Sequence, residues 1–152
     1  MATQLGAPTA ARQTELPGLP PCDQVGLVVR DLERAMAMYA PLFGPFTTMD
    51  GSVQQASYRG RLADVGLKIA YGRSGDLEIE LIEWTGGESP HREFIEAGRE
   101  GMHHIRFRVE DTDHWVEKLR PLGYEAVWYK RWSADTVFAY LERQGDPTLI
   151  EF

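Results

Sequence analysis

The chain has 152 residues, of which 43% are hydrophobic and 11% aromatic, and this composition is typical of one globular domain. Its 16 basic and 23 acidic side chains give a formal net charge of −7. This charge, without any run of Lys or Arg, excludes nucleic acid and anionic membranes as the main partner, while an anionic small molecule remains compatible with it.

The first 21 residues are rich in Ala, Thr, Gln, Gly and Pro. They have neither the basic start nor the apolar segment of a secretory signal. We therefore expect residues 1–21 to be a flexible tail and the folded domain to span residues 22–152. Because Cys22 is the only cysteine, an internal disulfide and a zinc-thiolate cluster are excluded, and we predict a cytoplasmic protein.

A strand and a helix are predicted at the start of the domain. Residues 23–30 alternate so that Val25, Leu27 and Val29 share one apolar face, a pattern typical of a half-buried strand. Asp31 then stands where the N-cap of a helix over residues 32–43 belongs, and Gly44 stands at its end.

This pattern recurs 80 residues later. At that shift Asp31 matches Asp111 and Pro41 matches Pro121, and the later stretch again has the pattern of strand, cap and helix. Each half continues with about three strand-like segments, so we infer an internal duplication and an α+β fold. The first half covers about residues 22–85, a junction about 86–100, and the second half about 101–152.

Four polar residues share the strand faces that point away from the predicted helices. They are Gln24, Glu80, His104 and Glu151. A polar face is also what an ordinary solvent-exposed sheet carries. The duplication favours a site instead, because it makes Gln24 equivalent to His104 and Glu80 equivalent to Glu151. Three oxygens and one nitrogen suit a divalent ion such as Zn²⁺, Ni²⁺, Co²⁺, Mn²⁺ or Fe²⁺.

The segments QVGLVVRDLERAMAMYAPLFG, EIELIEW, GMHHIRFRVED and TLIEF resemble the four signature segments of the vicinal oxygen chelate superfamily. That superfamily includes glyoxalase I, methylmalonyl-CoA epimerase, extradiol dioxygenases and bleomycin-resistance proteins. The resemblance implies two tandem βαβββ modules that form a cupped mixed sheet around one divalent metal ion, and a homodimer. It assigns as metal ligands Gln24, Glu80, His104 and Glu151. It selects His104 rather than His103, which should face the helix side or the junction.

The resemblance also implies a lyase, isomerase or epimerase acting on a small molecule. Such an enzyme removes a proton next to a carbonyl and stabilises the enolate on the metal. Glu151 is then the first candidate for the base, and Glu80 could return the proton. Arg106, on the same strand face as His104, is a candidate anchor for a substrate carboxylate or phosphate. A structural ion pair of Arg106 with Glu78 or Glu80 is an equal alternative.

Three interpretations of the activity stay open at this point. A set of Gln, Glu, His and Glu resembles that of eukaryotic-type glyoxalase I, whereas methylmalonyl-CoA epimerase usually carries His in place of Gln24 and Gln in place of Glu80. A metal-free small-molecule binding or resistance protein is the alternative from another class. A dioxygenase is disfavoured, because its iron needs two histidines and only His104 is available.

Overall fold

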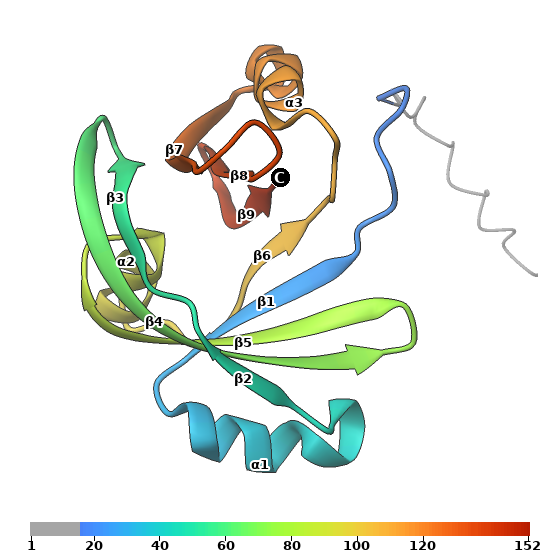
Figure 1. Cartoon of the computed structure of the whole chain (residues 1–152), viewed down its shortest axis with the longest axis vertical. Helices are drawn as coiled ribbons and strands as arrows, with labels where there is room; N and C mark the ends of the chain where they lie inside the picture. Colours follow the sequence, from blue (N-terminus) through green and yellow to red (C-terminus); the bar gives the residue numbers. More distant parts are fainter. Residues whose placement is uncertain (1–15) are drawn as a thin grey trace, which may run out of the picture.

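The computed structural model describes residues 16–152 (Figure 1). The first half contains one helix among five strands: β1 (Gln24–Val29), α1 (Leu32–Phe43), β2 (Thr47–Asp50), β3 (Val53–Tyr58), β4 (Arg61–Ser74) and β5 (Leu77–Gly87). The second half follows the short helix α2 (Pro90–Glu96) and contains β6 (Gly101–Arg106), α3 (Thr112–Leu119), the 3-10 turn η1 (Arg120–Leu122), β7 (Tyr124–Arg131), β8 (Val137–Arg143) and β9 (Asp146–Glu151).

The two main helices begin at the predicted caps. The Asp31 side chain accepts a hydrogen bond from the backbone N–H of Arg34 at 2.9 Å, and Asp111 does the same for His114 at 3.0 Å. These bonds satisfy backbone N–H groups that have no partner inside the helix. Pro41 lies inside α1 and does not end it, since the helix continues to Phe43.

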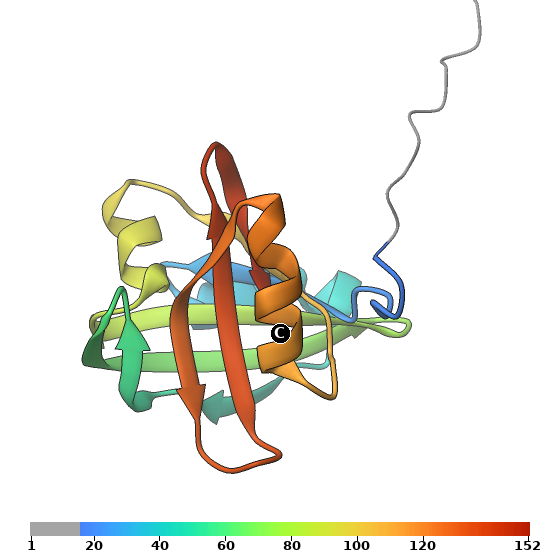
Figure 2. The ribbon, with the colours of Figure 1, turned by 90° about the horizontal axis from the view of Figure 1, so that it is seen from above.

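The strands close into a barrel-like cup (Figures 1 and 2). Going round it, the order is β1, β5, β4, β3, β7, β8, β9, β6 and again β1, and β2 pairs with β4 outside this circuit. β1 is parallel to β5 of its own half and antiparallel to β6 of the other half. The predicted α+β fold with a cupped mixed sheet is therefore confirmed.

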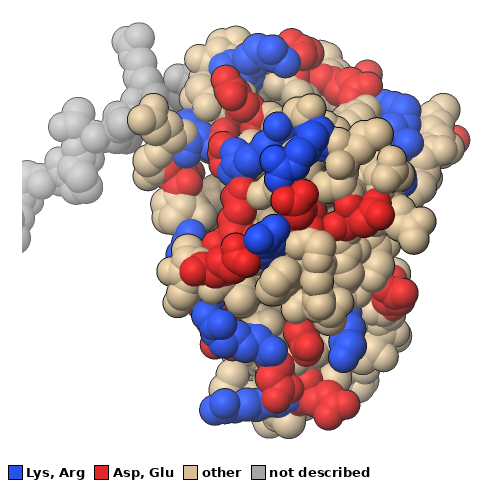
Figure 3. Space-filling model, turned by 90° about the vertical axis from the view of Figure 1, so that its left-hand side faces the viewer, with Lys and Arg blue, Asp and Glu red and all other residues tan. Residues whose placement is uncertain are grey.

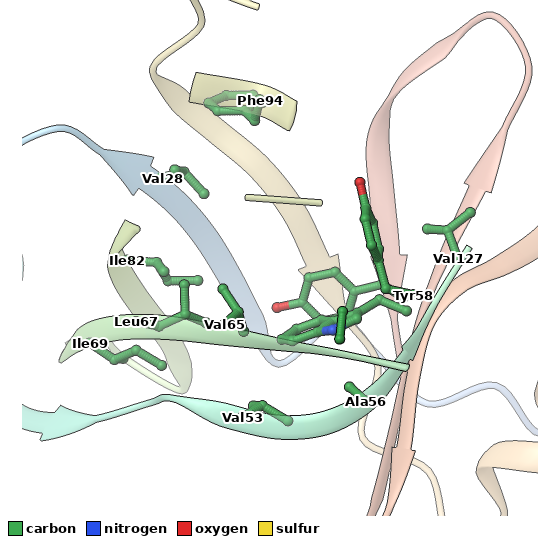
Figure 4. Packing of buried hydrophobic residues seen from close by; sticks show 13 residues of the cluster. Val28, Val53, Ala56, Tyr58, Val65, Leu67, Ile69, Ile82, Phe94 and Val127 are labelled. Atoms are coloured by element: carbon green, nitrogen blue, oxygen red, sulfur yellow. The ribbon is translucent and has the colours of Figure 1, made fainter. Parts of the chain in front are cut away.

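Three clusters of apolar side chains hold these layers together. One fills the concave side of the sheet and draws on both halves, including Val28, Tyr58, Val65 and Ile82 (Figure 4). The other two lie under α1 and under α3. Strand residues alternate between the concave cluster and a helix-covered cluster, so both faces of the sheet are largely buried.

Of the predicted tail, residues 1–21, the part up to residue 15 lies outside the described residues. In its remaining part Leu16 and Leu19 pack against the cluster under α3. None of the helices in the described part of the chain is long and apolar enough to cross a bilayer. Basic and acidic side chains are interspersed over the face that lies on the left of Figure 1 (Figure 3).

Candidate metal centre

Four adjacent strands, β5, β1, β6 and β9, meet at the candidate site. In their register Gly26 of β1 lies between Glu80 of β5 and His104 of β6. Because Gly26 has no side chain, the imidazole of His104 lies directly over β1. A Cβ atom at position 26 would be only 2.0–2.5 Å from three atoms of that ring. The glycine therefore makes the space through which His104 reaches the centre of the four strands.

Three oxygen atoms converge on Nε2 of His104. Its distances are 3.1 Å to Oε2 of Glu151, 3.2 Å to Oε2 of Glu80 and 3.3 Å to Oε1 of Gln24. The structure thus brings all four predicted ligands to one place. Gln24 and His104 are fully buried and Glu80 is 6% exposed, so bulk water is largely excluded from this donor set.

These separations fit a divalent ion. Metal bonds of about 2.0–2.2 Å place neighbouring ligand atoms roughly 3.0–3.5 Å apart in octahedral or tetrahedral geometry. Glu80, His104 and Glu151 each offer one ligand atom, a carboxylate oxygen or a ring nitrogen, and these three atoms lie within 4.8 Å of one another. Within the described residues, Oε2 of Glu80 and Oε2 of Glu151 are buried and accept no well-aligned hydrogen bond, as expected of atoms that bind a cation.

The charges of the site also favour a divalent ion. Burial lowers the pKa of His104, but the carboxylates of Glu151 and Glu80 outweigh burial and raise it to about 9. A single imidazolium offsets only one of two buried carboxylates, and an uncompensated buried charge costs several kcal/mol, on the order of 3–5. One divalent cation offsets both carboxylates and leaves His104 neutral, the form in which it binds metal.

Gln24 is held with its carbonyl oxygen towards the site. Its Nε2 donates a 2.7 Å hydrogen bond to Oε1 of Glu78, so its Oε1 is left to face His104. Arg106 donates two 3.0 Å hydrogen bonds to Asp23 and one of 3.5 Å to Glu78. These contacts match the alternative in which Arg106 forms a structural ion pair with Glu78. Asp23 is an additional partner that this alternative did not include. Its role as a substrate anchor stays a prediction.

Two tyrosines near the carboxylates were not assigned to the site from sequence. Tyr140 is the cross-strand partner of Glu151, and its ring lies 4.8 Å from that of His104. Burial, with the charges of Glu151 and Glu80, raises the pKa of Tyr140 well above its ordinary value. Burial and the charge of Glu80 likewise raise the pKa of Tyr71. Both phenols therefore keep their protons at neutral pH and can donate hydrogen bonds to a bound substrate.

His103 faces the other way. Its ring stacks on His91 at 4.9 Å and meets Phe94 edge-on at 5.0 Å, and both partners belong to α2. This places His103 on the side of the junction, as the strand alternation predicts. A cavity of about 650 Å³ between α2 and the turn from β8 to β9 has His103 in its wall and does not include the carboxylates of the site.

Comparisons with known proteins identify relatives of this chain. Residues 23–140 match the family model described as Glyoxalase/Bleomycin resistance protein/Dioxygenase superfamily. Methylmalonyl-CoA epimerase, mitochondrial, of Homo sapiens is 28% identical over 109 residues, which cover 68% of this chain and 57% of the human protein. The match thus spans little more than half of that relative, which is mitochondrial by name, whereas the sequence here predicts a cytoplasmic location.

Solved structures share the fold. A hypothetical protein from Bacillus halodurans has a TM-score of 0.62 at 22% identity, over 87% of this chain and 91% of its own. A variant of Streptomyces coelicolor methylmalonyl-CoA epimerase in complex with 2-nitronate-propionyl-CoA has a TM-score of 0.59 at 22% identity, over 88% and 94%. At such identities the likeness establishes the fold and leaves the reaction to the residues of the site.

Proposed function

The chain belongs to the glyoxalase/bleomycin resistance protein/dioxygenase superfamily, and from that premise we propose that it is a metal-dependent epimerase. It would move a proton at a carbon next to a carbonyl group. The observation that carries this proposal is the convergence of Gln24, Glu80 and Glu151 on Nε2 of His104, at 3.1–3.3 Å. Two of these groups are carboxylates that could also act as bases.

The ligands proposed for one divalent ion are Gln24, Glu80, His104 and Glu151. Zn²⁺, Ni²⁺, Co²⁺, Mn²⁺ and Fe²⁺ all suit this donor set. When bound, such an ion supplies Lewis-acid stabilisation of the negative charge that develops on a substrate carbonyl oxygen. The buried amide of Gln24 adds an oxygen ligand without adding charge. The two positive charges of the ion are therefore balanced by the two carboxylates.

The placement of the two carboxylates supports proton transfer at both faces of a carbon. Glu80 comes from β5 and Glu151 from β9, with β1 and β6 between them, so the two carboxylates reach the site from its two flanking strands. An epimerase needs one group to take the proton and another to return it on the other face. We assign the first step to Glu151, whose side chain is 15% exposed against 8% for Glu80, and the return to Glu80.

Neutral phenols complete the proposed site. Tyr140 and Tyr71 are positioned beside Glu151 and Glu80 and can donate hydrogen bonds to substrate oxygens. We propose an acyl-CoA thioester as the substrate class, because the human relative is named as an epimerase of such a compound and the Streptomyces structure holds an acyl-CoA analogue. The predicted homodimer is tested separately by sedimentation velocity.

The test combines metal analysis with isotope exchange. We expect purified protein to hold one divalent ion per chain and to incorporate solvent deuterium at the α-carbon of methylmalonyl-CoA. Glu151→Gln should lower the exchange rate by at least about 10²-fold, the usual contribution of a general base. The matched control is Glu110→Gln, which changes an exposed glutamate and should leave exchange unaltered.

Two other outcomes would redirect the assignment. Metal-containing protein that leaves methylmalonyl-CoA unchanged but converts the thiol adduct of a 2-oxoaldehyde would indicate a glyoxalase-type reaction. Protein that takes up no metal at neutral pH, and binds a small molecule tightly in the presence of a chelator, would indicate the metal-free binding protein instead.

A further inference from the structure

We propose that His103 is a positioning residue that fixes which nitrogen of His104 carries a proton, and so leaves Nε2 of His104 free to bind metal. This inference rests on the proposed metal site and deepens it, since it connects the site to α2. His103 itself is not one of the four proposed ligands.

The two neighbouring histidines share one hydrogen bond. Nδ1 of His103 lies 3.0 Å from Nδ1 of His104, and the two rings are nearly perpendicular, at 86°. His103 is 2% exposed and His104 fully buried, so water does not compete for this contact. At that distance one nitrogen must carry the proton and the other must accept it.

The oxygen donors decide the direction of this bond. Nε2 of His104 faces Gln24, Glu80 and Glu151 at 3.1–3.3 Å, and it needs a free lone pair to bind an ion among them. A neutral imidazole carries one N–H, so the proton of metal-bound His104 lies on Nδ1 and is donated to Nδ1 of His103.

The tautomer of His103 then follows by proton counting. Its Nδ1 accepts from His104, so the single proton of a neutral His103 lies on Nε2. With an ion in place of the second proton, His104 is neutral and the lone pair of its Nε2 is directed at the ion among Gln24, Glu80 and Glu151. This is the arrangement in which a ligating histidine is oriented by a hydrogen bond at its other nitrogen.

The surroundings keep His103 neutral and fixed. It is enclosed by His91, Phe94 and Tyr140, and burial, with the neighbouring histidines, lowers its pKa well below the ordinary value. His91 is in turn held by Ser89, the N-cap of α2, whose Oγ lies 3.0 Å from Nδ1 of His91. The helix thus holds the ring that orients the proposed ligand.

The first test measures metal affinity with Co²⁺ and its visible absorption. His103→Phe keeps a buried ring but removes the acceptor, so we expect roughly 10–100-fold weaker Co²⁺ binding, the usual cost of losing an outer-shell partner. His103→Asn should restore most of the affinity, because its Oδ1 can accept at the place of Nδ1. The control is His114→Phe, the same substitution at an exposed histidine outside the site, and its affinity should change by less than about 3-fold, well short of that cost.

Equal Co²⁺ affinity of His103→Phe and wild type would overturn the positioning role and leave the proposed function intact. Wild-type protein that binds no Co²⁺ or Zn²⁺ would overturn the proposed function together with this inference. If His103→Phe does not fold, ¹⁵N NMR of the imidazole groups in Zn²⁺-loaded wild type decides. A protonated Nδ1 and a metal-bound Nε2 on His104 support the proposal, and metal bound through Nδ1 contradicts it.

Discussion

Gly26 is the residue whose change should affect the candidate site most directly. Gly26→Ala adds a methyl group that would lie within 2.5 Å of the His104 ring, and the buried ring has little space to move. We expect at least 10-fold weaker binding of Co²⁺, comparable to the loss of an outer-shell partner, measured by titration of the metal-free protein.

A matched control is available on β5. Gly86 is also a strand glycine, but a Cβ added there would have no atom within 4 Å, and its φ is not positive. Gly86→Ala should therefore leave Co²⁺ affinity unchanged. If Gly26→Ala binds Co²⁺ as tightly as Gly86→Ala and wild type do, the position of His104 does not depend on the space above β1.

Strand alternation predicts the strand faces on which the site residues lie, and the family resemblance selects four of the polar residues on them. Gln24, Glu80, His104 and Glu151 each occupy the position opposite an apolar, helix-facing neighbour, and period-2 geometry places them on the concave face. The role of Glu78 depends on the rotamer of Gln24, and that of Tyr140 on a register across β8 and β9. Periodicity predicts neither, because apolar side chains cover both faces of β8.

At the scale of elements, Arg59 links the junction helix to the second half. It donates to Glu93 of α2 at 2.6 Å and to Glu142 of β8 at 2.7 Å, and Tyr58 also donates to Glu93. Burial raises the pKa of Glu93, but hydrogen bonds from Arg59 and Tyr58 outweigh it and lower the pKa below the ordinary 4.5.

This shift predicts an acid-dependent loss of stability. The contribution of the Glu93 carboxylate is present above about pH 4.5 and is lost as pH falls through the lower pKa of the folded state. Glu93→Gln should lower the free energy of unfolding at pH 7 by up to about 1 kcal/mol, since the group is partly exposed.

Urea unfolding at pH 7 and pH 3 checks this. At pH 3 the difference between the variant and wild type should be smaller than at pH 7, whereas a difference of the same size at both pH values would contradict the ionic origin. The control is Glu117→Gln, whose pair with Arg120 is about two-thirds exposed and should contribute less.

Element boundaries show where sequence reasoning ends. The caps Asp31 and Asp111 fix the starts of α1 and α3 because their side chains act locally. The division into β2 and β3 was not predicted from sequence, because these short strands pair with successive parts of β4. A long-range partner, rather than local pattern, determines where each of them ends.

For the whole molecule, the proposed ion would join strands from both halves. Gln24 and Glu80 come from the first half, and His104 and Glu151 from the second. A ligand that binds only the folded state at 100 times its Kd stabilises it by about 2.7 kcal/mol. For a chain of this size that corresponds to an increase in Tm of roughly 5–10 °C.

Thermal unfolding with and without Zn²⁺ measures this effect. A chelator should reverse the increase in Tm, and the double variant Glu80→Gln, Glu151→Gln should show no increase. An equal increase in the double variant would place the bound ion elsewhere on the molecule.

Which strands close the predicted cup was beyond sequence reasoning. The duplication indicates two similar halves, but not how their edges meet. In the structure β1 and β6 join one pair of edges, while β3 and β7 join the other pair through the pairings of Ser57 with Tyr129 and Tyr58 with Trp128. Such pairings between distant segments leave no local pattern along the chain.

The central position of β1 has a consequence for the folding rate. β1 pairs with β5 and with β6, which begin about 50 and 75 residues later in the chain. Loops of that length must close before the pairing of β1 contributes to stability, and such topologies fold slowly compared with helical bundles. The donor atoms on these strands can assemble only after those closures, so a metal ion has no complete site to bind until the slowest pairings have formed.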